Sequence, residues 1–164
     1  MTEPIRLVFD VPCSVADAFA VWTGGIADWW PKDHTVSAEP DLTVVLEGRP
    51  GGRIFERRSS GVEHDWGAVT IWEPPSRLGY TWHLNRDRSD ATDVEIRFVS
   101  RDVGTTRVEI EHSGWERLGT DRELWRDRNQ GGWATLLPHF VAAIQEHVRL
   151  PRRGRAVGDG ATDR

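Results

Sequence analysis

Six short segments of alternating apolar and polar residues, separated only by turns, restrict the fold of this chain more than any other feature. They span residues 42–46, 53–57, 65–72, 77–84, 93–99 and 106–112. Turn-forming residues such as Gly51-Gly52 and Pro74-Pro75 stand between them. Parallel strands need a crossover of about a dozen residues or more, and these connections are shorter. The pattern therefore predicts an antiparallel meander.

Further elements precede the predicted meander. Residues 5–11 alternate like a first, half-buried strand. Ser14 is a typical N-cap for a helix that ends at Gly24-Gly25. A second, short helix is expected over Ile26–Trp30, where the next residue is proline.

The last predicted element is a long helix with one continuous apolar stripe. Thr120 and Glu123 form the capping box expected at its start, Pro138 predicts a kink, and Pro151 ends it. The stripe follows the helical repeat and consists of Trp133, Leu136, Leu137, Phe140, Val141, Ile144 and Val148. The helix and the sheet bury each other's apolar faces only if the sheet curls around the helix.

These elements predict one α+β domain over residues 1–150. A curved antiparallel sheet wraps around a long C-terminal helix, and two short helices follow the first strand. The chain has 164 residues, enough for a single core. Residues 151–164 hold almost no apolar side chains and are expected to form a disordered tail.

The composition excludes several classes of protein. A net charge of −5 offers no basic excess to a nucleic acid. No apolar run approaches the roughly 20 residues that span a bilayer, and no secretory signal is recognisable, so we expect no membrane partner and a cytoplasmic location. Cys13 is the single cysteine, which excludes an internal disulfide. Lys32 is the only lysine among 21 basic residues, a bias typical of GC-rich coding such as that of actinobacteria.

Nine tryptophans are far more than an ordinary core of this size needs. Three of them, Trp66, Trp72 and Trp82, share the even parity of two neighbouring segments, and one parity means one face of a strand. The complete even-numbered face reads Trp66, Ala68, Thr70, Trp72, Leu78, Tyr80, Trp82 and Leu84. Such a wall either faces a ligand or fills a half-open sheet, and both interpretations stay open.

Two histidines are the candidate acid–base residues. His64 shares the parity of Trp66, and His112 has the inward parity of its own segment, so both are expected to point inward. Each is either a general base or a structural histidine satisfied by a nearby hydroxyl or carboxylate. His83 and Asn85 have the opposite parity and are expected to face solvent.

Other chemistries lack their sequence patterns. No His-x-x-x-His or Glu-x-x-His pattern lies on a predicted helix to hold a metal. The chain also lacks a Gly-x-Ser-x-Gly nucleophile turn and a Gly-x-Gly-x-x-Gly or lysine-containing phosphate loop. We therefore expect neither a metal nor another cofactor.

The order of the elements and several motifs resemble the START-like (SRPBCC) superfamily, and within it the AHSA1-like family of Hsp90-ATPase-activator homologues. The motifs are Trp29-Trp30-Pro31, Gly51-Gly52-Arg53, Gly67-Ala68-Val69, Leu78 to Trp82 and Gly132-Trp133. A second set is similar to the calicheamicin-resistance group of START-like proteins from enediyne producers: Glu63-His64, Trp82-His83-Leu84-Asn85, Glu111-His112 and Leu118-Gly119-Thr120. The resemblance covers residues 5–148 and implies a helix-grip (START/Bet v 1-like) fold.

The resemblance also implies a cavity between sheet and long helix for an apolar or aromatic small molecule. The residues expected to bind it are Trp30, Trp66, Trp72, Tyr80, Trp82, Phe98, His112, Trp115, Trp133 and Leu137. The favoured hypothesis is non-catalytic binding or sequestration, in antibiotic self-resistance or natural-product biosynthesis, because aromatic residues outnumber positioned acids and bases. The alternative is a START-fold enzyme of the cyclase, dehydratase or hydrolase type, with His64 or His112 as general base.

The expected assembly is a monomer or a weak homodimer. An Hsp90-type chaperone partner is not expected, because it would require a large exposed apolar patch. The odd-numbered faces of the predicted strands are polar instead, for example at Glu95, Arg97 and Glu109.

Overall fold

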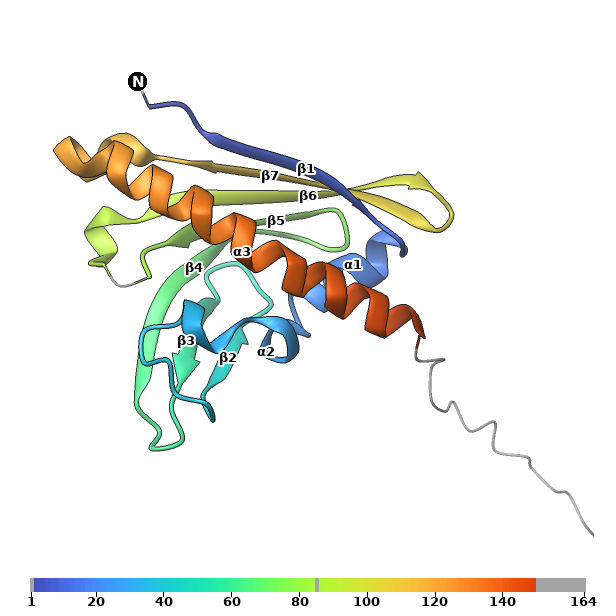
Figure 1. Ribbon diagram of the computed structural model, residues 1–164, viewed down its shortest axis with the longest axis horizontal. Helices are drawn as coiled ribbons and strands as arrows, with labels where there is room; N and C mark the ends of the chain where they lie inside the picture. The colour runs from blue at the N-terminus through green and yellow to red at the C-terminus, as the bar shows by residue number, and fades with distance from the viewer. Residues whose placement is uncertain (1, 85, 150–164) are drawn as a thin grey trace, which may run out of the picture.

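Seven antiparallel strands form one curved sheet in the computed structural model, which describes residues 2–84 and 86–149 (Figure 1). The strands are β1 (Ile5–Val11), β2 (Thr43–Leu46), β3 (Arg53–Arg57), β4 (Glu63–Glu73), β5 (Arg77–Trp82), β6 (Thr92–Asp102) and β7 (Thr105–Ser113). Their order in the sheet is β1-β7-β6-β5-β4-β3-β2. Strands β2 to β7 are therefore the predicted meander, and β1 pairs with β7.

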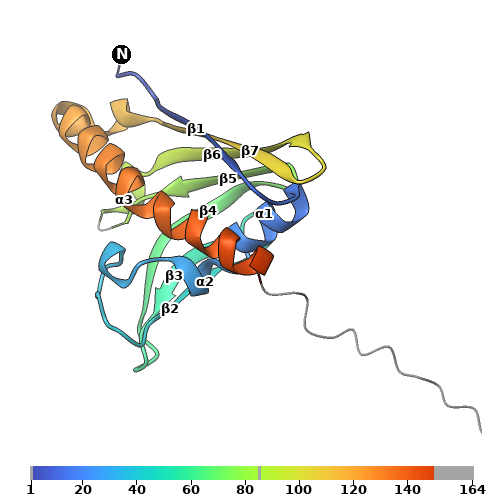
Figure 2. The ribbon, with the colours of Figure 1, turned by 45° about the vertical axis from the view of Figure 1, so that its right-hand side comes forward.

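Three α-helices and three short 3-10 helices complete the described part of the chain. They are α1 (Val15–Trp22), α2 (Ile26–Trp29), α3 (Arg122–Arg149), η1 (Lys32–His34), η2 (Arg88–Asp90) and η3 (Trp115–Asp121). Helix α3 crosses one face of the curved sheet, and α1 and α2 lie beside its C-terminal half (Figures 1 and 2). This arrangement confirms the helix-grip fold. None of the described helices has the length and apolar content to cross a membrane.

Local signals set most helix boundaries. Ser14 caps α1 as predicted, because its hydroxyl accepts a hydrogen bond from the Asp17 N–H over 3.2 Å. The start of the last helix differs from the prediction: Thr120 lies inside η3, and α3 begins at Arg122. Gly119 interrupts η3 with a φ of 61°, a conformation that favours glycine, and so moves the helix start past the predicted capping box. The predicted end at Pro151 and the predicted tail over residues 151–164 lie outside the described residues.

The apolar stripe of α3 packs on the sheet along its centre, and its other members are half-buried or exposed. Its buried members are Trp133, Leu136, Phe140 and Ile144. Val148 is 53% exposed, although the sequence places it in the stripe. At 100° per residue, Val148 lies about 60° from Trp133, on the same side as the half-buried Leu137. The stripe is therefore buried along its centre and partly open along one side.

Aromatic side chains fill the space beneath α3. Phe140 is fully buried, and its ring centre lies 4.8 Å from that of Trp22. Phe19 from α1 lies 5.1 Å from Trp72 and 5.5 Å from Phe98. Several aromatic residues are thus core residues, in agreement with one of the two interpretations of the tryptophan excess.

The predicted even-numbered aromatic face is interrupted within β4. Trp66 is buried as expected, but Val69 is buried and Thr70 is exposed, which reverses the predicted parity. The pairing of β4 with β5 changes register between Val69 and Ile71. An extra residue in one strand reverses the alternation of side chains beyond it. The even-numbered residues therefore do not form one continuous wall.

Candidate ligand-binding cavity

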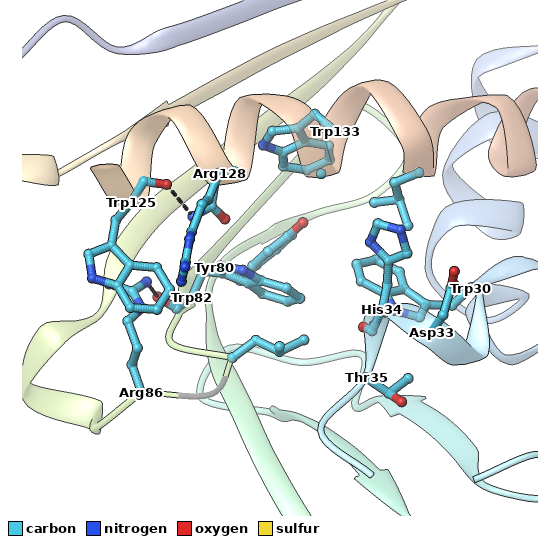
Figure 3. A pocket seen from close by; sticks show the side chains of 14 residues that line it. Trp30, Asp33, His34, Thr35, Tyr80, Trp82, Arg86, Trp125, Arg128 and Trp133 are labelled. Atoms are coloured by element: carbon cyan, nitrogen blue, oxygen red, sulfur yellow. Dashed lines mark hydrogen bonds between the residues drawn. The ribbon is translucent and has the colours of Figure 1, made fainter. Parts of the chain in front are cut away.

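A cavity of about 340 Å³ lies between β5, the N-terminal half of α3 and residues 30–35, which include η1 (Figure 3). Its volume is at the lower end of the range for small-molecule sites. The lining residues are Trp30, Asp33, His34, Thr35, Tyr80, Trp82, Leu84, Arg86, Trp125, Arg128, Asn129, Gly132, Trp133 and Leu136.

Aromatic rings form much of the cavity wall. The ring centre of Trp82 lies 5.6 Å from that of Trp30 and 5.8 Å from that of Tyr80. Helix α3 adds Trp125 and Trp133, which are eight positions and therefore about two turns apart. Figure 3 shows these rings around a common space. Burial raises the pKa of the Tyr80 hydroxyl, so this group is a neutral phenol in the wall.

Residues 30–35 are fixed by hydrogen bonds within residues 30–38. The Trp30 indole N–H donates to the backbone oxygen of His34 over 2.9 Å. The Thr35 hydroxyl accepts a hydrogen bond from the Ala38 N–H over 2.9 Å. These bonds fix the Trp30 ring and the turn of the chain that follows η1.

Glu56 on β3 anchors the two residues that directly follow this segment, Val36 and Ser37. Its carboxylate is fully buried and accepts hydrogen bonds from four donors: the backbone N–H groups of Val36 and Ser37, the Ser37 hydroxyl at 2.7 Å and the Trp66 indole at 2.9 Å. Burial raises the pKa of Glu56, but these hydrogen bonds lower it, and the net shift is downward. Glu56 therefore stays charged and ties the chain after η1 to the sheet.

Two arginines flank Trp125 at one end of the cavity. The guanidinium carbons of Arg86 and Arg128 lie 4.8 and 5.2 Å from the centre of the Trp125 ring. Figure 3 shows all three side chains at the same end. Both cations therefore belong to the cavity wall.

Arg86 has only backbone acceptors among the described residues. It donates to the carbonyl oxygens of Asp90, over 3.0 Å, and Trp82, over 3.3 Å, while its Nε is buried without a partner. Within the described ranges, neither Arg86 nor Arg128 has a carboxylate within 4.0 Å. Burial lowers the pKa of Arg86, and the charge of Asp90 opposes this shift. An anionic group in the cavity would gain from these two cations.

His112 is buried behind the cavity wall and fully hydrogen-bonded. Its Nδ1 accepts a hydrogen bond from the Trp133 indole N–H over 3.0 Å. Its Nε2 must then carry the proton and donate to the Thr92 hydroxyl over 2.7 Å, and Thr92 donates in turn to the Trp82 carbonyl over 3.2 Å. Burial, helped by the charge of Arg86, lowers the pKa of His112 to about 3. This arrangement matches the structural interpretation of His112.

The structure brings four of the ten predicted ligand-binding residues into the cavity wall: Trp30, Tyr80, Trp82 and Trp133. Trp66 lies behind the wall, with its ring centre 5.2 Å from Trp30 and 5.7 Å from Trp82. His112 and Trp115 form a buried pair 4.3 Å apart beyond Trp133. Trp72 and Phe98 pack around Phe19, and Leu137 lies in a separate groove against β1.

The two other histidines considered in the sequence analysis, His64 and His83, do not line the cavity. His64 lines an open, polar depression that meets the cavity at Arg86 and Trp125. His83 was expected to face solvent, but only 5% of it is exposed. Strand β5 ends at Trp82, so the two-residue alternation no longer applies to His83. Asn85 lies outside the described residues.

Most of the α3 wall of the cavity and the charged and polar residues of the cavity were not identified from the sequence. Trp125, Asn129, Gly132, Trp133 and Leu136 follow the helical repeat, so extending the stripe of α3 toward its N-terminus would have found the α3 wall. Asp33 and His34 in the three-residue helix η1 and Arg86 in a connection carry no comparable signal, because the path of such short segments depends on tertiary contacts.

Two chemical features of the described residues bear on cofactors and reactive groups. No three His, Cys, Asp or Glu side chains in this part of the chain gather closely enough to hold a metal ion. Cys13 is buried, and burial together with the charge of Asp17 raises the pKa of its thiol to about 11. The thiol is therefore protonated at neutral pH and acts as a small core side chain.

Comparison with known proteins adds a family and several structures. The family model described as Activator of Hsp90 ATPase homolog 1-like protein matches residues 12–145. A search of curated proteins finds no match.

Three solved structures illustrate the likeness. CalC from Micromonospora echinospora, described as a self-sacrificing resistance protein, is 29% identical, with a TM-score of 0.69 over 88% of this chain and 96% of CalC. Txn09, described as an anthrahydroquino-gamma-pyrone synthase, is 33% identical, with a TM-score of 0.54 over 74% of this chain and 82% of Txn09. CalU16 from Micromonospora echinospora is 18% identical, with a TM-score of 0.59 over 88% of this chain and 78% of CalU16, a likeness of fold alone.

Proposed function

The chain belongs to the family of Activator of Hsp90 ATPase homolog 1-like proteins, and we propose that it binds a planar aromatic small molecule in the cavity between β5 and α3. The observation that carries this proposal is the set of rings around the space: Trp30, Tyr80, Trp82, Trp125 and Trp133. Stacked or edge-to-face aromatic contacts add to the free energy of burying apolar surface. The occupant is therefore a flat, unsaturated ring system.

The two guanidinium groups narrow the ligand class further. Arg86 and Arg128 both lie close to the Trp125 ring and have no carboxylate partner among the described residues. A carboxylate or phenolate on the ligand would meet charged donors at that end of the cavity. The proposed ligand is thus an aromatic acid whose rings contact Trp82 and whose anionic group approaches Arg86.

Binding without chemical conversion agrees best with the surroundings of the predicted bases. His112 is buried, fully hydrogen-bonded and neutral, and His64 lies in a different depression. A general base must reach the substrate proton directly or through one water. We assign the binding to self-resistance or to natural-product biosynthesis, since CalC is described as a resistance protein and Txn09 as a synthase.

Calorimetric titration tests the binding and its charge dependence. The probe is anthraquinone-2-carboxylate, with the uncharged anthraquinone-2-carboxamide as its matched analogue. Arg86→Gln is expected to weaken carboxylate binding about 10-fold and to leave carboxamide binding within about twofold. Arg101→Gln, an exposed substitution near the turn between β6 and β7, serves as the control. If neither probe binds the wild-type chain, the proposed function is wrong.

A catalytic role is the second candidate, and the likeness to Txn09 favours it. His34 and Asp33 do line the cavity, so a candidate base and a candidate acid are present there although His64 and His112 are elsewhere. Mass analysis of polyketide-like probes after incubation separates the two roles. An unchanged mass supports binding alone. Turnover that falls by about 100-fold or more in His34→Gln would establish catalysis instead.

A further inference from the structure

Strand β1 forms one edge of the sheet, and its outer side has no strand partner among the described residues. Figures 1 and 2 show β1 along the rim of the molecule. It is seven residues long, and Val8 at its centre is 63% exposed. A long open edge offers a row of backbone N–H and C=O groups to another strand. The edge is thus suited to pairing with a further strand.

An apolar groove of about 570 Å³ runs beside this edge, between β1 and α3. Leu7 and Phe9 form its β1 wall, and Leu137, Pro138 and Val141 form its α3 wall. Leu137 and Val141 are the members of the apolar stripe of α3 on its half-open side. A partner strand that pairs with the open edge of β1 would lie beside this groove and would also cover it.

We propose that the occupant is a second copy of this chain, paired antiparallel through β1 about a twofold axis at Val8. The sequence of β1, Ile-Arg-Leu-Val-Phe-Asp-Val, is self-complementary in that register. Arg6 of one copy lies opposite Asp10 of the other, and the symmetric contact repeats the pair. An isologous interface needs this kind of self-complementary surface.

Two requirements fix the register: the apolar faces of the two strands must lie on the same side of the sheet, and opposite charges must face each other. In the proposed register, Ile5 of one copy lies opposite Val11 of the other, and Val8 lies opposite Val8 at the twofold axis. All seven residues of β1 are then paired. A shift by one residue would place the polar face of one copy beside the apolar face of the other. A shift by two residues would set Arg6 opposite Val8 or beyond the strand. Only the central register joins opposite charges over the full strand.

The charges already present on β7 extend this pattern across the sheet. Arg6 forms an ion pair with Glu111 at 3.1 Å, and Asp10 lies opposite Arg107 in the β1–β7 register. In the dimer, a row of alternating charges would run from Glu111 through Arg6 to Asp10 and Arg107 of the second copy. Opposite charges on neighbouring strands stabilise the pairing, and like charges oppose it.

The inner face of the same pairing is apolar. Leu7 of one copy meets Phe9 of the other, and the two α3 helices approach each other above the joined sheet. The groove walls formed by Leu137 and Val141 would then cover one another. Burial of this surface supplies the hydrophobic contribution that an isolated strand pair lacks.

Charge reversal tests the register directly. In sedimentation velocity of the full chain over a range of concentrations, the wild type is expected to dimerise reversibly. Arg6→Glu and Asp10→Arg each place like charges at two symmetric contacts, so each should weaken dimerisation about 10-fold or more. An equimolar mixture of the two variants should dimerise again, because every reversed position then faces an opposite charge. A loss caused by misfolding could not be restored by mixing.

Arg57→Glu is the control, since Arg57 is an exposed residue of β3, which lies near the opposite end of the strand order from β1. It should leave dimerisation unchanged. A wild type that stays monomeric at every concentration overturns the proposal. So does a dimer that tolerates both reversals. Hydrogen exchange gives a second measurement: protection of the β1 amides should rise with protein concentration. Protection that is complete in the monomer would mean that the chain itself covers the edge, which also contradicts the proposal.

Discussion

The indole N–H of Trp133 on α3 donates a hydrogen bond to Nδ1 of His112 on β7 over 3.0 Å. This bond leaves the His112 proton on Nε2, where it is shared with Thr92 on β6, and Thr92 in turn binds the carbonyl of Trp82 on β5. One neutral histidine thus connects the long helix to three neighbouring strands. Two aromatic residues of the cavity wall, Trp82 and Trp133, are held at the two ends of this series of hydrogen bonds.

The stability of the fold should depend on pH through His112. Burial lowers the pKa of His112 to about 3, whereas an unfolded histidine titrates near its ordinary value of 6.5. Between these values the unfolded chain binds a proton that the folded chain does not. The contribution of His112 to the free energy of unfolding should therefore be constant above about pH 6.5 and fall by up to about 1.4 kcal/mol per pH unit below it.

Urea unfolding at about pH 7 and about pH 5 measures this dependence, because most carboxyl groups still remain charged at the lower value. His112→Gln removes the titrating group, so its unfolding free energy should change less between the two pH values. His139→Gln, at an exposed position of α3, should keep the wild-type difference. An unaltered pH dependence in His112→Gln would show that other groups cause it.

Replacing Trp82 should weaken ligand binding more than replacing Trp72, although the sequence places both tryptophans on the same face of the sheet. Trp82→Ala removes a cavity wall and is expected to weaken binding of anthraquinone-2-carboxylate about 10-fold or more. Trp72→Ala removes a ring that packs on Phe19, away from the cavity, and should leave the affinity of the folded protein within about threefold. Calorimetric titration of both variants compares them. Equal losses would mean that the ligand does not occupy this cavity.

Phe140→Ala should destabilise the fold by about 3 to 5 kcal/mol, because it removes a fully buried ring from the cluster with Trp22 and Trp29. Chemical denaturation gives the free energy of unfolding. Val148→Ala on the same helix is the control, and at 53% exposure it should change stability by less than about 0.5 kcal/mol. A loss below about 1 kcal/mol for Phe140→Ala would mean that α3 does not cover the core in solution.

Glu56→Gln should cost about 2 to 4 kcal/mol, although the two side chains have nearly the same shape. The carboxylate accepts hydrogen bonds from four donors, and an amide nitrogen in place of one oxygen cannot accept any. Val36 and Ser37 follow the segment that carries His34, so ligand affinity should fall as well. Urea unfolding and titration of the same variant measure both effects. The exposed Glu116→Gln should change neither.

Much of the fold is predictable because its signals are local. The strand over residues 5–11 and the helix capped by Ser14 have the predicted positions, since alternation and capping depend on neighbours in sequence. The antiparallel meander follows from short connections, which exclude crossovers. The errors arise where one residue changes the path of the chain. Gly119 moves the start of α3, and the register shift near Val69 reverses the parity of β4.

The sequence by itself determined the type and order of the elements and that aromatic residues would be buried against the long helix. Only the tertiary structure decided that Trp82 lines a cavity while Trp72 packs in the core. It also decided that both ring nitrogens of His112 are hydrogen-bonded and that Arg86 lies beside Trp125. The physical reason is that periodicity assigns a side chain to a face, whereas its neighbours on that face depend on strand register, on bulges and on loops that meet across long sequence distances.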